Sequence, residues 1–249
     1  MRRWTVVASL CAAAVLAVAP TADAQRQPVR AKTDAAAAHA RLAPLEAALA
    51  AAPDDLRRGN DYRREVIATG QYDRALAFFD DLVTKHPGAA NAHLNYGFAY
   101  VDKIPDAGAI TQVILANNAL TQFTKALDIE RSWIGLYTRG NSYLFWPKIF
   151  GRTRLGIADL EEALRSQQAG PRRHHHVRVY IALGDGYWIM DDFDKARSTW
   201  EAGLALFPDN AVLKSRLGTQ GDALASLITA AYDHTRRVDT SLEDLWTDR

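Results

Sequence analysis

Two stretches of the chain, near residues 70–87 and 184–208, share one spacing of small, aromatic and proline residues. In each, an alanine precedes an aromatic residue by four positions and a proline by twelve: Ala75, Phe79 and Pro87 in the first, and Ala196, Trp200 and Pro208 in the second. The second stretch also carries Gly184 and Tyr187 ahead of its alanine. A spacing that recurs along a chain indicates stacked copies of one small unit, because a single unit cannot bury its apolar face alone.

Two further copies of the pattern lie between these stretches, and both contain extra residues at the same turn. The second copy has Gly97 and Tyr100 before Ala119 and Phe123, and the third has Gly140 and Tyr143 before Gly156 and Leu160. About ten residues are added in the second copy and about four in the third, relative to the uninterrupted spacing.

The spacing resembles the tetratricopeptide repeat, whose unit of about 34 residues is a pair of antiparallel helices. Small residues stand where the two helices cross, aromatic residues fill the space beside them, and proline ends the second helix. The resemblance implies an all-α fold, a right-handed superhelical solenoid. We expect four repeats near residues 56–89, 90–132, 133–172 and 177–210, followed by a capping helix near 211–236.

The first 24 residues have the pattern of an export signal. Arg2 and Arg3 precede an apolar run, Val6–Ala19, and Ala22-Asp23-Ala24 matches the small-x-small form of a cleavage site. The run is shorter than the roughly 20 residues that cross a bilayer. We therefore predict cleavage after Ala24, export to the periplasm and no stable membrane insertion, with an uncleaved anchor as the alternative.

Cleavage would remove the one cysteine, Cys11, and with it any disulfide or thiolate chemistry. Residues 1–24 hold two of the 30 Lys+Arg and one of the 29 Asp+Glu, so the remaining chain has balanced charge. A neutral protein is a poor partner for a polyanion, which argues against nucleic acid binding.

The remaining segments complete the predicted organisation. Residues 25–39 are expected to form a flexible leader, and the helical repeat domain is expected over 40–236. Pro44 lies within an alanine-rich stretch, so a helix should start again there, with proline in its first turn. The tail, 237–249, has a short amphipathic stripe that either caps the solenoid or docks on a partner.

The resemblance also predicts a binding surface, since the first helix of each repeat lines a concave groove in this family. The groove positions are occupied by mixed aromatic, amide and guanidinium side chains, which suit an extended peptide: Arg57, Arg64, Asn91, Phe98, Tyr137, Asn141, Arg178, Asp185 and Trp188. Some family members bind a C-terminal carboxylate through Lys and Asn. Asn95 fits that pattern, but Asn60 and Arg64 replace the first Lys and Asn.

The two insertions form a second candidate surface, which we call the insertion rim. Neighbouring repeats should place the insertions side by side, and insertions on one face often bind the partner. The rim candidates combine aromatic and basic residues: Lys103, Trp146, Lys148, Phe150 and Arg152. Aromatic residues of this kind either anchor a partner or fill the space between helices.

The histidine run His174–His176 suggests a metal site only weakly, because adjacent side chains on a helix diverge and no cysteine completes a ligand set. The sequence contains no phosphate-binding loop, nucleophile elbow or zinc-protease motif. We therefore predict no catalytic residue, no metal and no cofactor.

The expected function is a non-catalytic scaffold that binds a protein or peptide. A small-ligand or metal carrier using His174–His176 and Trp146 is the alternative, and self-association through the end helices is compatible with both.

Overall fold

The computed structural model describes residues 22–234 and 236–247, and these residues form eleven α-helices, four short 3-10 helices and no strand. None of the described helices is both long and apolar enough to cross a membrane. The chain divides into two compact units, Met1–Ala40 and Arg41–Arg249. The predicted signal, residues 1–24, lies almost wholly outside the described residues.

The first unit contributes the beginning of α1 (Ala22–Ala51). The leader expected over residues 25–39 is therefore helical, in keeping with the high helix propensity of its many alanines. The helix also passes through Pro44 without restarting. Within the second unit, Leu42 and Leu49 on either side of Pro44 are completely buried, and this packing compensates for the hydrogen bond that proline removes.

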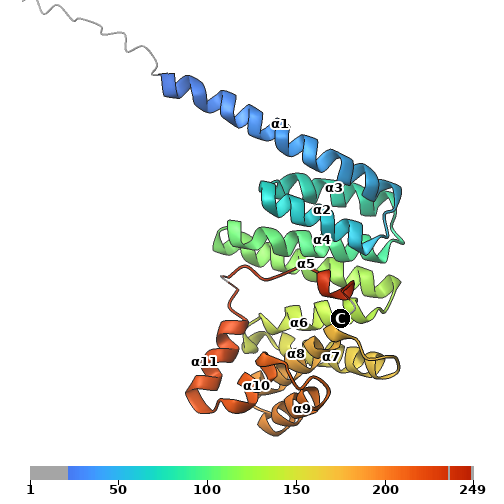
Figure 1. The fold of residues 1–249 in the computed structure, drawn as a ribbon, viewed down its shortest axis with the longest axis vertical. Coiled ribbons are helices and arrows are strands. Elements are labelled where there is room, and N and C mark those ends of the chain that lie inside the picture. The colour runs from blue at the N-terminus through green and yellow to red at the C-terminus, as the bar shows by residue number, and fades with distance from the viewer. Residues whose placement is uncertain (1–21, 235, 248–249) are drawn as a thin grey trace, which may run out of the picture. The chain divides into compact units, whose positions relative to one another are not determined.

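Four helix pairs and two further helices follow in the second unit, and they confirm the predicted helical-repeat solenoid (Figure 1). The pairs are α2 (Leu56–Thr69) with α3 (Tyr72–Lys85), α4 (Ala90–Lys103) with α5 (Ala109–Ile129), α6 (Trp133–Leu144) with α7 (Arg152–Gln168), and α8 (Val177–Ile189) with α9 (Phe193–Leu206). Helix α10 (Ala211–Gly218) packs on α9, and α11 (Gly221–Ala231) follows it. Successive pairs stack on one another through contacts such as α3 with α4 and α7 with α8.

Local chemistry sets the ends of these helices. Asp55 accepts a hydrogen bond from the backbone N–H of Arg58 at 3.0 Å and caps α2, and Ser132 caps α6 in the same way. The turn after α2 needs a left-handed residue, which Gly70 supplies with a φ of 66°. The same turn after α8 uses Asp191, with a φ of 64°, since aspartate tolerates that conformation better than most residues.

The crossing of the paired helices explains the small residues of the repeat. A Cβ atom added to Gly97 would lie 2.3 Å from the Phe123 ring, and one added to Gly184 would lie 2.2 Å from Trp200. Where two helices come this close, an aromatic ring of one packs directly on the backbone of the other. The Gly-to-aromatic spacing thus reports the crossing point within each pair.

The extra residues of the second repeat are largely helical. They lengthen α5 at its N-terminal end, after a short 3-10 helix, Ile104–Asp106. In the third repeat the additional residues form the 3-10 helix Lys148–Phe150 before α7. The first turns of α5 carry apolar side chains to the surface, where Ile110 is 81% exposed and Val113 is 52% exposed.

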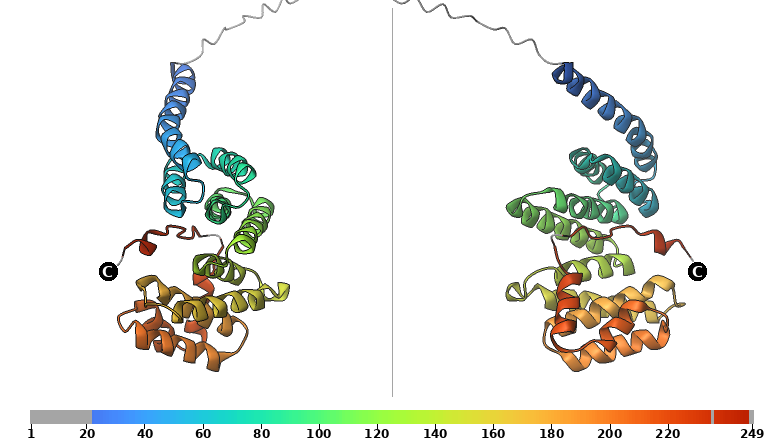
Figure 2. Two further views of the ribbon diagram at one scale, coloured as in Figure 1. Left: turned by 90° about the vertical axis from the view of Figure 1, so that its right-hand side faces the viewer. Right: turned by 60° about the vertical axis from the view of Figure 1, so that its left-hand side comes forward.

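The C-terminal segment does not continue the solenoid. After α11 the chain runs back along the repeats and ends in the 3-10 helix Glu243–Leu245 (Figures 1 and 2, dark red). We call residues 237–247 the C-terminal strap.

Candidate functional site

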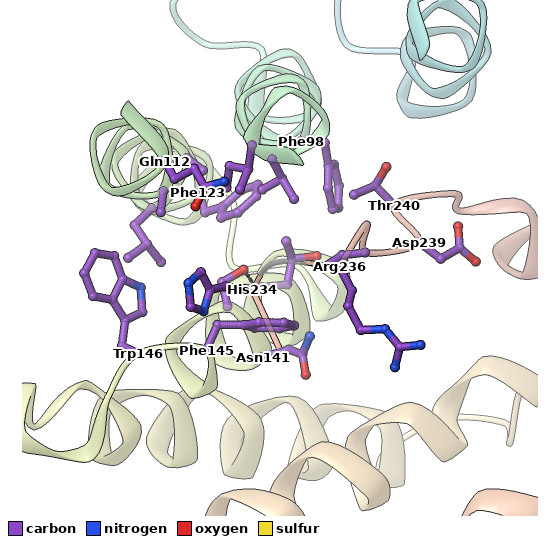
Figure 3. Close-up of a pocket in the computed structure, with 18 of the residues that line it drawn as sticks. Phe98, Gln112, Phe123, Asn141, Phe145, Trp146, His234, Arg236, Asp239 and Thr240 are labelled. Carbon is purple, nitrogen blue, oxygen red and sulfur yellow. Dashed lines mark hydrogen bonds between the residues drawn. The ribbon is translucent and has the colours of Figure 1, made fainter. Parts of the chain in front are cut away.

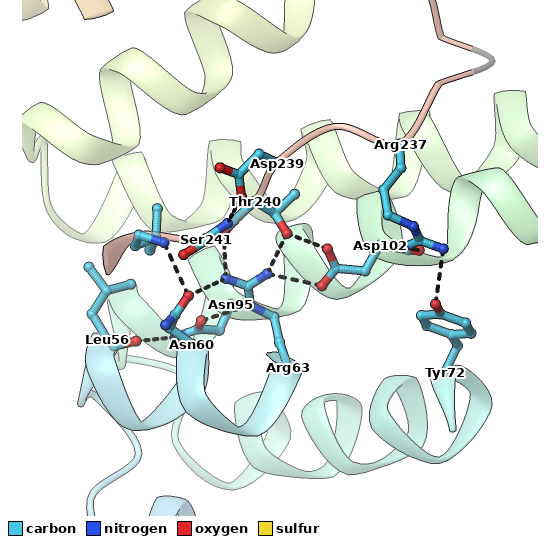
Figure 4. A network of polar contacts seen from close by, with 11 residues as sticks. Leu56, Asn60, Arg63, Tyr72, Asn95, Asp102, Arg237, Asp239, Thr240 and Ser241 are labelled. Carbon is cyan, nitrogen blue, oxygen red and sulfur yellow. Dashed lines mark hydrogen bonds and ion pairs between the residues drawn. The ribbon is translucent and has the colours of Figure 1, made fainter. Parts of the chain in front are cut away.

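The C-terminal strap lies against the first helices of the repeats, which form the predicted groove. Its residues contact side chains of α2, α4 and α8, and each of these contacts joins residues at least 66 positions apart along the chain. Figure 4 shows the strap crossing α2 and α4, with polar side chains from all three segments directed at one another. The groove is therefore occupied, in cis, by a segment that has no α-helix of its own.

Arg63 is the centre of these contacts. It is 1% exposed, and its Nη1 lies 2.9 Å from an Asp102 carboxylate oxygen, so the two form a buried ion pair between α2 and α4. The same guanidinium donates to the strap, to Thr240 Oγ1 at 3.1 Å and to the Thr240 backbone carbonyl at 3.0 Å. Asn95 accepts from Arg63 Nε at 3.1 Å and fixes its orientation. One arginine thus joins two repeats and the strap.

Leu242 is the apolar anchor of the strap. It is 2% exposed and packs in a cluster with Leu94, Phe98 and Ile134. Its backbone N–H donates to Asn60 Oδ1 at 3.2 Å, which sets the register of the strap in the groove. Burial of a leucine side chain stabilises by about 1.5–3 kcal/mol, and Leu245 and Trp246 of the strap are partly buried against the same cluster.

Charged contacts flank this anchor on both sides. Glu243 pairs with Arg64, and Asp244 lies 2.8 Å from Arg178. The Arg57 guanidinium lies 5.6 Å from the centre of the Trp246 ring. The Glu243 pair is more than half exposed, so we expect it to contribute at most about 1 kcal/mol and to act mainly in selectivity.

At the other end of the strap, Arg237 donates to the Asp102 backbone carbonyl at 3.0 Å and to the Tyr72 hydroxyl at 3.1 Å. These contacts, together with those of Thr240, anchor the strap beside α4 before it reaches the Leu242 socket.

A cavity of about 580 Å³ lies beside the strap, bounded by α4, α5, α6 and both insertions (Figure 3). Its volume falls in the range typical of small-molecule sites. The walls are mainly aromatic and aliphatic, with six Phe, Tyr or Trp rings: Phe98, Phe123, Tyr137, Phe145, Trp146 and Phe150. Gln112 and Asn141 add polar groups, and Thr240 and Leu242 of the strap close one side.

The insertion rim contributes unequally to this cavity. Trp146 is partly buried against the core, with the Arg152 guanidinium 3.6 Å from its ring centre, whereas Phe150 is 60% exposed. Trp146 therefore helps to fill the space between helices, whereas the Phe150 ring lies at the surface of the rim. Arg152 also donates to Asn117 of α5 at 3.0 Å and so joins the two insertions. Lys103 and Lys148 do not line the cavity. Lys103 pairs with Asp73, and Lys148 pairs with Asp191.

The ten predicted groove residues divide into three groups. Three of them bind the strap through charge or ring contacts: Arg57, Arg64 and Arg178. Three line the cavity: Phe98, Tyr137 and Asn141. The other four, Asn91, Asn95, Asp185 and Trp188, make internal contacts.

The residues of the third group hold the solenoid together rather than facing a partner. Asn91 binds Asp54 in the turn before α2, and Asn95 binds Leu56 and Arg63. Asp185 is completely buried in a two-bond ion pair with Arg216 of α10, and Trp188 packs in the C-terminal core. Asp185 therefore has no exposed surface for a partner, because Arg216 of α10 covers it.

The histidine run does not converge. Its three residues form the 3-10 helix His174–His176, and the rings of His175 and His176 pack on Trp133 with centres 4.9 and 5.4 Å away. Burial, helped by the nearby charges of His175 and Arg173, lowers the pKa of His176 to about 4. Within the described residues no three His, Cys, Asp or Glu side chains gather as metal ligands.

Sequence analysis did not single out Arg63 or Asp102. A signal was nevertheless present, because Arg63 precedes Ala75 by the same twelve positions that separate Gly184 from Ala196. A large charged residue where the other three repeats have glycine marks a departure from their packing. Its partners, Asp102 and Thr240, lie too far along the chain for any spacing to indicate them.

The paired helices, their stacking and the crossing glycines define a tetratricopeptide-repeat fold. A comparison with solved structures agrees: TTC0263, described as a thermophilic TPR protein in Thermus thermophilus, has a TM-score of 0.53 and 22% identity, over 81% of this chain and 99% of that one. YrrB, described as a TPR protein with an unusual peptide-binding site, gives a TM-score of 0.49 and 19% identity over 81% and 88%. No protein-family model matches the sequence, and no match is found among curated proteins.

Proposed function

We propose that this chain is a non-catalytic binding protein that holds an extended segment of a partner protein in the groove and along the insertion rim. The observation that carries the proposal is the strap, an extended segment already held there. With the export signal expected over residues 1–24, the site of action is the periplasm.

The groove supplies each type of contact that an extended peptide requires. Arg63 and Asn60 bind backbone groups, at the Thr240 carbonyl and the Leu242 N–H. The Leu242 socket takes an apolar side chain, and Arg64 and Arg178 take carboxylates. Backbone contacts supply affinity for any extended chain, while the socket and the arginines supply selectivity.

Site-directed photo-cross-linking tests this proposal. A photo-reactive amino acid at Arg64, which is exposed on α2 at the groove, is compared with one at Arg197, which is exposed on α9. We expect an envelope protein to cross-link from Arg64 and not from Arg197. The groove variant Tyr137→Ala/Arg178→Ala should lose that product while its circular dichroism spectrum is unchanged. Equal cross-linking from both positions, or none from either, would contradict the proposal.

The cavity favours a second candidate function, carriage of a small apolar molecule. The Trp146 region contributes to this candidate through the cavity wall. Lauric acid, a saturated fatty acid, serves as the probe, and a bound ligand should raise the melting temperature. Ala116→Trp should fill the cavity and abolish that rise. Ala205→Trp, at an exposed position of α9, should retain it. A wild-type melting temperature unaffected by the probe would count against this candidate.

A further inference from the structure

We propose that the C-terminal strap is an internal ligand of the groove, and that a partner binds by displacing it with a segment of the same chemistry. That segment would have a hydroxyl residue, a leucine-sized residue two positions later, and acidic residues directly after it, as in Thr240, Leu242, Glu243 and Asp244. The inference rests on the proposed function, since it specifies which segments the groove accepts.

The strap is bound in the manner of a ligand rather than as a part of the solenoid. It crosses the first helices of several repeats but forms no helix pair with any of them. The connection that leads to it, from His234 to Arg237, is exposed where it is described. Detachment of the strap therefore leaves the four helix pairs and α10 in place.

The socket remains complete when the strap leaves. Arg63 keeps its ion pair with Asp102 and its hydrogen bonds to Asn95 and Asn60, so this buried pair of charges stays intact. The residues around Leu242, such as Leu94 and Phe123, belong to the core of the second repeat and are held there by α4 and α5. A site that persists without its occupant is open to exchange.

The strap is also an imperfect occupant. Asn60 Nδ2 is buried beneath it with no hydrogen-bond acceptor among the described residues, and one Asp244 carboxylate oxygen is likewise buried without a donor. Asn60 Oδ1 is already used by Leu242 and Arg63, so rotating the amide would not help. Beside Leu242, the strap lines one side of the cavity of about 580 Å³ and does not extend across it. A segment that satisfies Asn60 and extends into this cavity would bind better.

The acidic character of the expected partner follows from the cations that face the strap. Arg64 and Arg178 meet consecutive carboxylates, Glu243 and Asp244, and Arg57 lies over Trp246. Three arginines facing one short segment favour negative charge directly after the apolar anchor. A basic segment would place like charges against them.

A peptide-binding experiment with the full chain tests the inference. The probe is a fluorescein-labelled peptide with the sequence of Val238–Thr247, and binding is followed by fluorescence anisotropy. In Leu242→Asp the internal strap should be released, because a carboxylate in an apolar socket is unfavourable. We expect the peptide to bind this variant at least ten-fold more tightly than the wild type. The matched control, Leu155→Asp on the exposed side of α7, should behave as the wild type does.

A second release variant guards against loss of folding. Glu243→Lys/Asp244→Lys changes two strap residues that lie outside the core and should give the same gain in peptide affinity. A peptide carrying the Leu242→Asp change should not bind either variant. Equal affinity for wild type and both release variants, or no binding to any of them, would overturn the inference.

Other outcomes separate the alternatives. If light scattering shows wild-type dimers that become monomers in Leu242→Asp, the strap occupies the groove of a second copy and the internal-ligand proposal is refuted. If cross-linking from Arg64 captures a partner that the peptide cannot compete away, the proposed function stands and this inference fails. If the peptide competes, both stand.

Discussion

The first and fourth repeats follow the same spacing, yet one equivalent position holds glycine in the fourth repeat and a buried arginine in the first. Twelve residues before the repeat alanine, the fourth repeat has Gly184, against which Trp200 packs directly. The first repeat has Arg63 there, buried in an ion pair with Asp102. The fourth repeat also buries an ion pair, but one residue later, between Asp185 and Arg216 of the capping helix α10.

The two ion pairs differ in what their arginines have left to bind. Arg216 directs two hydrogen bonds to Asp185, at 2.9 and 3.0 Å, and so closes the end of the solenoid. Arg63 uses one bond for Asp102 and has donors that reach Thr240. The remaining donors of Arg63 thus bind the strap, whereas these two hydrogen bonds of Arg216 go to its carboxylate partner.

The largest effect is expected from Arg63→Met. It leaves Asp102 buried without its charge partner and removes the anchor of the strap. We expect the free energy of unfolding to fall by about 3–5 kcal/mol, measured by urea denaturation and circular dichroism, and the strap to become sensitive to limited proteolysis. Arg197→Met, which breaks an exposed pair with Glu201, is the control and should cost less than about 1 kcal/mol. A protease-resistant strap in Arg63→Met would contradict the conclusion that Arg63 anchors the strap.

Arg216→Met should produce a comparable loss of about 3–5 kcal/mol, because Asp185 is completely buried. The strap should stay protected from protease in this variant, since none of its anchors involves Arg216. The comparison between the two arginines would fail if both variants released the strap to the same extent.

Gly184→Ala tests how tightly the helices pack at the position of the fourth repeat that is equivalent to Arg63 in the first repeat. The added Cβ would lie 2.2 Å from Trp200 Nε1, so the ring or the helix must shift. We expect a loss of about 1–3 kcal/mol in the free energy of unfolding. Gly218→Ala, where nothing lies within 4 Å of the added Cβ, is the matched control and should be close to neutral. Equal effects of the two changes would mean that the crossing is not tight.

The smallest effect concerns pH and the start of the fourth repeat. The pKa of His176 is about 4 in the folded chain and about 6.5 when unfolded, so the unfolded state takes up the proton first as the pH falls. Its contribution to stability is complete above about pH 6.5 and is lost between there and about pH 4. Partial exposure of the ring reduces the effect.

The measurement is the shift of the urea midpoint between pH 7 and pH 5. His176→Gln should show a smaller decrease than the wild type, and His86→Gln, exposed at the end of α3, should show the wild-type decrease. Identical shifts in all three proteins would remove His176 as a cause. The first repeat, which begins at the Asp55 cap instead, contains no such histidine in its first helix.

Much of the fold could be predicted because its signals are local. The distances from Gly184 and Ala196 to their aromatic neighbours reflect helix geometry and crossing, which involve residues within one repeat. The same spacing placed Arg57, Arg64 and Arg178 on the groove face, and they do face the strap. It could not distinguish groove side chains from those that the next helix covers, as Asp185 shows.

By itself, the sequence determined the helix pairs, their stacking and the set of helix positions expected to face the groove. These features follow from the periodicity and from the small residues at the helix crossings. Only the tertiary structure decided what lies in the groove. Arg63 and Thr240 are 177 residues apart, and their contact depends on the path of the chain after α11 rather than on any local pattern. The cavity likewise exists because two insertions and the strap meet, and such a meeting is a property of the assembled solenoid.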